Sequence, residues 1–109
     1  MKLTSPITSI NLDSNFHALS DPIRLEILDL LRNRELCVCD LNEALKISQS
    51  KLSFHLKVLK EAQLVQSTQE GRWAYYRINL AQFIVLEEYL AQFRRFSPIL
   101  PPRACEDKT

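Results

Sequence analysis

Two short helical segments joined by only a few residues are the feature that most limits the fold of this 109-residue chain. Asp40 and Glu43 have the spacing of a capping box and predict the start of one short helix. Ser48 is a suitable cap for the next helix, which we expect to extend to about Ala62. The link around Lys46 leaves room only for a tight turn, so the two segments predict a helix-turn-helix.

Two further helices are expected before this unit. Leu12, Phe16 and Leu19 recur at helical spacing and predict a short first helix. The stretch from Ser20 to Pro22 is typical of a helix start, because a proline in the first turn loses no hydrogen bond. The second helix is expected to extend to about Asn33.

A β-hairpin and a last helix are expected after the unit. The segments 65–68 and 74–78 are rich in β-branched and aromatic residues, and the only glycine of the chain, Gly71, lies between them. A long helix is expected from about Leu80 to Phe96. The predicted fold class is therefore mainly α with a small β-hairpin, in the order α-α-α-α-β-β-α, which is a winged helix-turn-helix.

The predicted first and last helices carry more apolar surface than a domain of this size can cover. We therefore expect a homodimer, whose two-fold symmetry would suit a palindromic operator. The alternative is that the two helices pack only on each other. The DNA-binding and dimerisation domain is expected over residues 10–96, between a flexible N-terminus at 1–9 and an extended, proline-containing tail at 97–109.

Composition points to a protein of the cytoplasm. Hydrophobic residues make up 46% and charged residues 25%, as in an average soluble protein. No apolar run approaches the roughly 20 residues that span a bilayer, and the N-terminus lacks a signal pattern, so no membrane association is expected. Three cysteines are too few for a disulfide scaffold and favour a reducing compartment.

The net charge of +1 conceals an uneven distribution. From Lys46 to Arg77 the chain has six basic and two acidic residues, so this segment carries +4 and the remainder −3. A basic segment within an acidic chain favours a nucleic-acid partner.

The predicted helix after Ser48 has two faces. Leu52, Leu56, Leu59 and Gln63 cluster on the side expected to face the core, with His55 at its edge and hydrogen-bonded locally. The opposite side is free to enter a major groove, where an amide or hydroxyl can read base edges, an aromatic ring can pack on a thymine methyl and lysines can contact phosphates. The predicted DNA-binding residues are Gln49, Ser50, Lys51, Ser53, Phe54 and Lys57, with Lys60 as a further phosphate contact and Arg72 at the hairpin tip entering a minor groove.

Cys37 and Cys39 lie just before the predicted helix start at Asp40. Residues two apart point about 200° apart in a helix but share a face in an extended chain, so these thiols can hold one ion only if the chain around Val38 is not regular helix. Thiolates select soft ions, and nearby helix N–H groups are expected to lower the pKa of the thiols. The alternative is two small apolar residues near the core.

Three stretches together resemble the ArsR/SmtB family of winged-helix repressors: Glu35–Leu41, Ser48–Leu59 and Gly71–Ile78. The similarity extends over about residues 12 to 95, and the Cys-Val-Cys-Asp-Leu box is similar to that of the arsenite-responsive branch. The resemblance implies a homodimeric repressor of a resistance operon. It would bind double-stranded operator DNA without a cofactor and be released when As(III) or Sb(III) binds Cys37 and Cys39.

The chain departs from this pattern at two positions. Arsenite sensors of this type often have a third cysteine where this chain has Asn42, and As(III) prefers three sulfurs. The third ligand would then be Cys105, a small external thiol or water. The family usually has a polar or basic residue where this chain has Phe54, which affects the operator sequence it would read.

Two other functions remain open from the sequence. One is a redox-sensing repressor of the same fold, in which Cys37 or Cys39 is oxidised. The other is a protein-interaction module that has lost DNA binding. An enzyme is not expected, because the sequence offers no oxyanion site or substrate pocket for a cysteine nucleophile.

Overall fold

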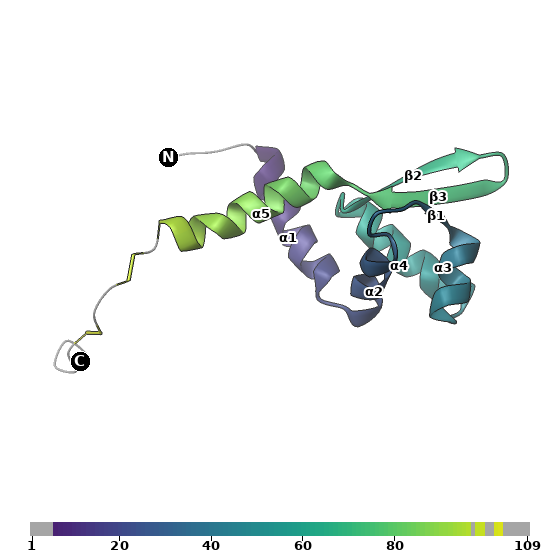
Figure 1. Cartoon of the computed structure of the whole chain (residues 1–109), viewed down its shortest axis with the longest axis horizontal. Helices are drawn as coiled ribbons and strands as arrows, with labels where there is room; N and C mark the ends of the chain where they lie inside the picture. Colours follow the sequence, from purple (N-terminus) through teal and green to yellow (C-terminus); the bar gives the residue numbers. More distant parts are fainter. Residues whose placement is uncertain (1–5, 97, 100–101, 104–109) are drawn as a thin grey trace.

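The computed structural model describes residues 6–96, 98–99 and 102–103, with side chains from residue 12 onward. Within this part of the chain, five helices and a three-stranded antiparallel sheet form a winged helix-turn-helix, as predicted (Figure 1). The elements are α1 (Pro6–Leu19), α2 (Pro22–Leu30), β1 (Leu36–Cys37), α3 (Val38–Leu45), α4 (Gln49–Glu61), β2 (Val65–Glu70), β3 (Trp73–Ile78) and α5 (Leu80–Arg95).

The first helix begins earlier than predicted. It starts at Pro6, inside the segment 1–9 that we expected to be flexible, and a proline's fixed φ suits the first turn of a helix. Residues 1–5 and most of the predicted tail, including Cys105, lie outside the described residues. The extended tail and the domain limits of 10–96 therefore stay predictions.

Local side-chain chemistry explains the limits of α2 and α4. The carboxylate of Asp21 accepts hydrogen bonds from the backbone of Ile23 and Arg24, as expected of a helix cap. The helix α2 ends at Leu30, before the predicted limit, and the chain turns at Asn33 with a φ of 68°. The hydroxyl of Ser48 caps α4 in the predicted way by accepting from the backbone N–H of Lys51.

The turn between α3 and α4 depends on one left-handed residue. Lys46 ends α3 with a φ of 54°, and its backbone N–H donates to the carbonyl of Asn42. The side chain of Asn42 in turn donates to the carbonyl of Ile47 over 2.7 Å. These two bonds hold the short connection that was predicted from the sequence.

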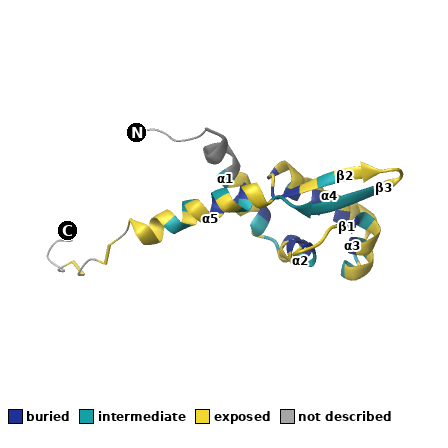
Figure 2. Ribbon diagram, turned by 45° about the horizontal axis from the view of Figure 1, so that its top comes forward, coloured by how far each residue is buried: buried dark blue, intermediate teal, exposed yellow. Residues whose placement is uncertain are grey.

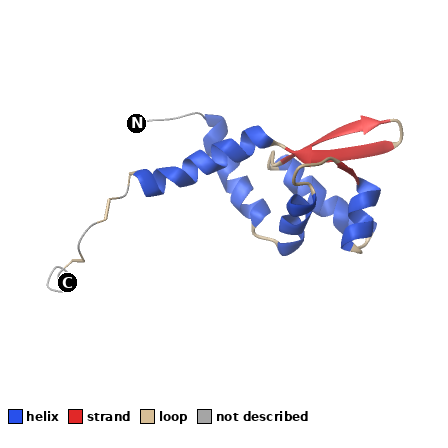
Figure 3. Cartoon of the chain, in the orientation of Figure 1, coloured by secondary structure: helices blue, strands red, loops and turns tan. Residues whose placement is uncertain are grey.

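The predicted hairpin is confirmed, and a third strand joins it. The strands β2 and β3 pair from Val65 opposite Ile78 to Glu70 opposite Trp73, and Gly71 turns the chain with a φ of 64°. The short strand β1 pairs with the other edge of β3, placing Cys37 opposite Tyr75. Figure 3 shows this sheet on one side of the helical body.

The hydrophobic core lies among α2, α3, α4 and the base of the hairpin. Figure 2 shows buried residues concentrated there, whereas α5 and the hairpin tip are largely exposed. The core cluster comprises Ala18, Ile27, Leu28, Leu31, Leu41, Leu52, Leu56, Leu59, Ala62, Leu64 and Val65.

A buried polar chain connects α1 and α5 to the end of α4. The Nδ2 of Asn15 donates to the carbonyl oxygen of Ala62 over 2.7 Å, and Nε2 of Gln82 donates to Oδ1 of Asn15 over 2.8 Å. Because each of these buried groups has a partner, the contact specifies how the two terminal helices meet α4.

Much of the apolar surface of α1 and α5 stays uncovered in a single chain. The exposed fraction is 41% for Phe16, 63% for Ile84 and 59% for Phe93. In α5, Leu86 is buried, whereas Leu90 is 50% exposed. Among the described helices, none has the length and apolar character that a membrane crossing requires.

Candidate functional site

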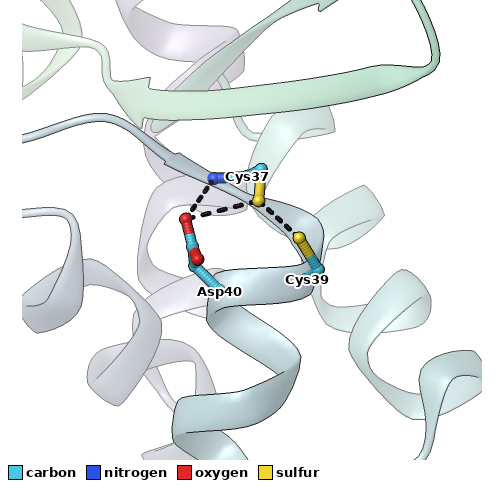
Figure 4. Close-up of side chains that lie close together, drawn as sticks. All are labelled: Cys37, Cys39 and Asp40. Carbon is cyan, nitrogen blue, oxygen red and sulfur yellow. Dashed lines mark hydrogen bonds between the residues drawn. The ribbon is translucent and has the colours of Figure 1, made fainter.

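The two cysteines meet at the junction of β1 and α3 (Figure 4). Cys37 precedes the helix with an extended backbone, at φ −83° and ψ 166°, whereas Cys39 lies in the first helical turn. This change of backbone conformation lets residues two apart share a side, and their sulfurs lie 2.7 Å from each other. From the sequence, both thiols could reach one ion only if the chain around Val38 departs from regular helix. The departure lies at Cys37, whereas Val38 is already helical.

The start of α3 differs from the prediction. The helix begins at Val38, and Asp40 occupies its third position and does not cap it with Glu43. The carboxylate of Asp40 instead reaches back and accepts from the backbone N–H of Cys37 at 3.3 Å. The predicted capping box was wrong because Asp40 stabilises the helix start from inside the first turn.

Asp40 also joins the two thiols as a third possible ligand. Its Oδ2 lies 3.3 Å from Sγ of Cys37. The ligand atoms of Cys37, Cys39 and Asp40 all lie within 4.8 Å of one another. Sequence reasoning treated Asp40 only as a cap, although a carboxylate one residue after a cysteine pair was itself a signal.

The two thiols have different surroundings. Cys37 is buried, at 7% exposure, whereas Cys39 is exposed. The pKa of Cys39 is raised above its ordinary value of 9.0, first by its hydrogen bond to Cys37, then by desolvation and by the negative charges of Cys37 and Asp40. The expectation of a lowered pKa is therefore wrong for Cys39, because the backbone N–H of Asp40 is the weakest influence on it.

The predicted DNA-reading residues all lie exposed, and the leucine stripe of α4 lies buried on its other side. Phe54 is 57% exposed although it is aromatic. Gln63 is the exception to the predicted faces, because α4 ends before it and the residue is exposed with a φ of 67°. The exposed set consists of Gln49, Ser50, Lys51, Ser53, Phe54, Lys57 and Lys60 on α4 and Arg72 in the hairpin turn.

His55 is buried behind this face and is held by a distant residue. Nη1 of Arg24 lies 3.0 Å from Nδ1 of His55, and because a guanidinium can only donate, Nδ1 is the acceptor. Desolvation lowers the pKa of His55, and the charges of Arg24 and Lys51 lower it further against the opposing effect of Asp21. The predicted local hydrogen bond is thus replaced by one from another helix.

Known proteins resemble this chain in both sequence and fold. Residues 21–67 match the model of a family described as bacterial regulatory protein, arsR family. The chain is 41% identical over 86 residues to an arsenical resistance operon repressor of Bacillus subtilis strain 168, covering 76% of this chain and 82% of that protein. A protein of the same description from Staphylococcus xylosus is 51% identical over 61 residues, covering 56% of this chain and 59% of the relative. The crystal structure of a possible transcriptional regulator for arsenical resistance superimposes with a TM-score of 0.67 at 31% identity, covering 73% of this chain and 83% of that one.

Proposed function

The chain belongs to the arsR family of bacterial regulatory proteins, and from this premise we propose that it is a metalloid-responsive transcriptional repressor. It binds operator DNA as a homodimer in the cytoplasm and is released when As(III) or Sb(III) binds Cys37 and Cys39. The observation that carries the proposal is the 2.7 Å separation of the two sulfurs at the start of α3, the helix that precedes the reading helix α4. The names of the relatives support arsenical resistance as the regulated response.

The donor set suits a thiophilic ion. Thiolates prefer soft ions, and both sulfurs come from one short stretch of chain, so a single ion can be held without large movement. Cys105 or a small external thiol would supply the third sulfur, with water as the alternative. X-ray absorption of the arsenite complex, wild type against Cys105→Ser, distinguishes these sources by the number of sulfur neighbours.

The reading face suits a major groove. Gln49 and Ser50 lie at the N-terminus of α4, where side chains of a recognition helix reach base edges, and Gln49 can bond bidentately to adenine. Ser53 can bond to bases or phosphates, and Lys51 and Lys57 supply phosphate contacts. Arg72 lies in the hairpin turn, from which it would enter a neighbouring minor groove.

The exposed apolar surfaces of α1 and α5 support the homodimer. Phe16, Ile84 and Phe93 remain uncovered in one chain, and a second copy would bury them. The buried chain of Asn15, Gln82 and the Ala62 carbonyl would then connect this interface to α4. A two-fold axis through the terminal helices would present two reading helices to a palindromic operator.

Single cysteine substitutions test the proposal. Cys37→Ser and Cys39→Ser should each leave operator affinity near that of the wild type and abolish release by arsenite. Operator affinity is measured by fluorescence anisotropy with and without arsenite. Release of either central mutant at the wild-type arsenite concentration would contradict the assignment.

A redox-sensing repressor is the second candidate, because two free thiols in contact can become a disulfide. Peroxide would take two electrons from the pair, giving one disulfide and two waters. Such a sensor requires that oxidation of Cys37 and Cys39 change operator binding. Parallel titrations with peroxide and with arsenite against operator binding separate the two functions.

A further inference from the structure

A hollow of about 360 Å³ lies where α3, α4 and β3 meet. We call it the α3–α4–β3 hollow. Its wall consists of Val38 of α3, Tyr76 of β3 and five residues of α4, namely Ser53, Leu56, Lys57, Lys60 and Glu61. The two candidate sites border each other here, because Val38 lies between the cysteines while Ser53 and Lys57 belong to the predicted DNA face.

The chemistry of the hollow fits a phosphate group. Lys57 and Lys60 are exposed cations on its rim, and Ser53 and Tyr76 carry hydroxyl groups that can donate hydrogen bonds. Glu61 also borders the hollow, so two positive charges face one negative charge. A hollow with a net positive rim, beside the residues expected to enter the groove, matches a backbone phosphate of DNA.

Val38 is the residue of this wall that an ion would move. It is half-buried, packs against the core cluster and is the first residue of α3. On its N-terminal side, Cys37 is fixed by pairing with Tyr75 in the sheet and by the hydrogen bond to Asp40. On its C-terminal side, Cys39 is exposed and lies in the first turn of the helix.

One ion bonded to both sulfurs would restrict the chain at Val38. Bonds from Sγ of Cys37 and from Sγ of Cys39 to a common ion close a ring that contains the backbone of Val38. Because Cys37 is held by the sheet and by Asp40, this ring constrains the first turn of α3 from its Cys39 side.

We propose that the α3–α4–β3 hollow seats a backbone phosphate of the operator, and that Val38, through its place in the wall, couples the ion at Cys37 and Cys39 to loss of that phosphate. This inference rests on the proposed function, and it names the residue that transmits the ion signal. Val38 is a positioning residue, because it offers no ligand atom to the ion and acts through the wall that it shares with Ser53 and Lys57.

Val38→Ala tests the coupling. The variant should bind arsenite as tightly as the wild type, followed by ultraviolet absorption of the thiolate complex. Its operator Kd should change little when arsenite is added, whereas the wild type should show a rise within the range of about 5- to 150-fold that is usual for such coupling. Val58→Ala, which truncates another half-buried valine packed on the same core, should keep the wild-type response.

Two further results decide the inference. Val38→Ile keeps a branched side chain in the wall and should retain the response, and Val38→Thr, which keeps the side-chain shape but adds a hydroxyl, replaces Val38→Ala if that variant does not fold and should weaken the response. If Val38→Ala binds arsenite and is released from the operator to the same extent as the wild type, the inference is overturned and the proposed function stays intact. Failure of wild-type protein to bind arsenite at the cysteine pair would instead overturn the proposed function.

Replacement of single operator phosphates by neutral methylphosphonates locates the phosphate. At one position, the replacement should weaken operator binding by the wild type but should not further weaken binding by Lys60→Gln. Glu61→Gln should strengthen binding to the unmodified operator. Absence of any such position would overturn the phosphate assignment. Inorganic phosphate provides the second arm of the test. If millimolar phosphate displaces the operator more strongly than chloride does at equal ionic strength, the result identifies a site for the free anion and contradicts a site for the DNA backbone.

Discussion

Arg24 on α2 and His55 on α4 are joined by one buried hydrogen bond of 3.0 Å, with the guanidinium as donor. The same guanidinium donates from Nε to the carbonyl of Ala18 over 2.9 Å and from Nη2 to that of His17 over 3.3 Å. Both carbonyls belong to the last turn of α1, where the helix dipole favours a positive charge. A single buried side chain therefore connects the terminal helix α1 to the reading helix α4.

Arg24→Met should destabilise the fold strongly. It keeps much of the side-chain volume but leaves Nδ1 of His55 and the carbonyl of Ala18 without the Arg24 donor, whereas the carbonyl of His17 still accepts from Ser20; the expected cost is about 2–4 kcal/mol in the free energy of unfolding. Urea titration followed by circular dichroism measures the change. Arg32→Met, which breaks only the exposed pair with Asp29, should cost less than about 1 kcal/mol, and equal effects of the two variants would contradict this role of Arg24.

Stability should fall on mild acidification because of His55. Its pKa is lowered from 6.5, so between the lowered native value and 6.5 the unfolded chain binds more protons at this position than the folded chain. The free energy of unfolding therefore rises with pH through this window, and the contribution is complete above it and is lost as pH falls through it. In His55→Asn the amide oxygen can accept from Arg24 and nothing titrates, so the difference between its stability curve and that of the wild type should change as the pH falls below 6.5. Parallel curves would show that His55 does not titrate as described.

Lys57→Ala should weaken binding to every DNA sequence to a similar extent. A phosphate contact gives affinity without base information, so the slope of log K against log salt should become shallower by about one. Titrations of operator and unrelated DNA at several salt concentrations measure both effects. Arg32→Ala removes an exposed charge outside the predicted DNA face and serves as the control. A changed base preference in Lys57→Ala would mean that this residue reads bases.

Phe54 should distinguish thymine from uracil. Its ring is 57% exposed on the reading helix and can pack on the thymine methyl group. Replacement of operator thymines by deoxyuridine should therefore weaken the wild type several-fold and affect Phe54→Ala much less. Anisotropy measurements with both duplexes form a double cycle, and equal losses in the two proteins would exclude the methyl contact.

The parts of the fold that were predicted correctly have strong local signals. Ser48 has the right side chain for a helix cap, and Leu52, Leu56 and Leu59 repeat over several turns, so α4 and its buried face follow from short-range chemistry. Gly71 marks the hairpin turn for the same reason, because its φ of 64° suits glycine.

The parts that were missed depend on partners far away in the chain or on weak signals. The strand β1 has two residues, which is too short for an alternating pattern, and it exists because β3 pairs with it. Asp40 was placed at the wrong helix position because a cysteine is an uncommon cap residue. The hydrogen bond between Arg24 and His55 joins positions 31 residues apart, which only the packing of α2 on α4 brings together.

Cys37 and Cys39 are separated by one residue, so both sulfurs of the pair come from the same chain. In the proposed dimer each subunit would therefore carry its own complete pair. Inactivating the pair in one copy would leave the two sulfurs of the other copy in place.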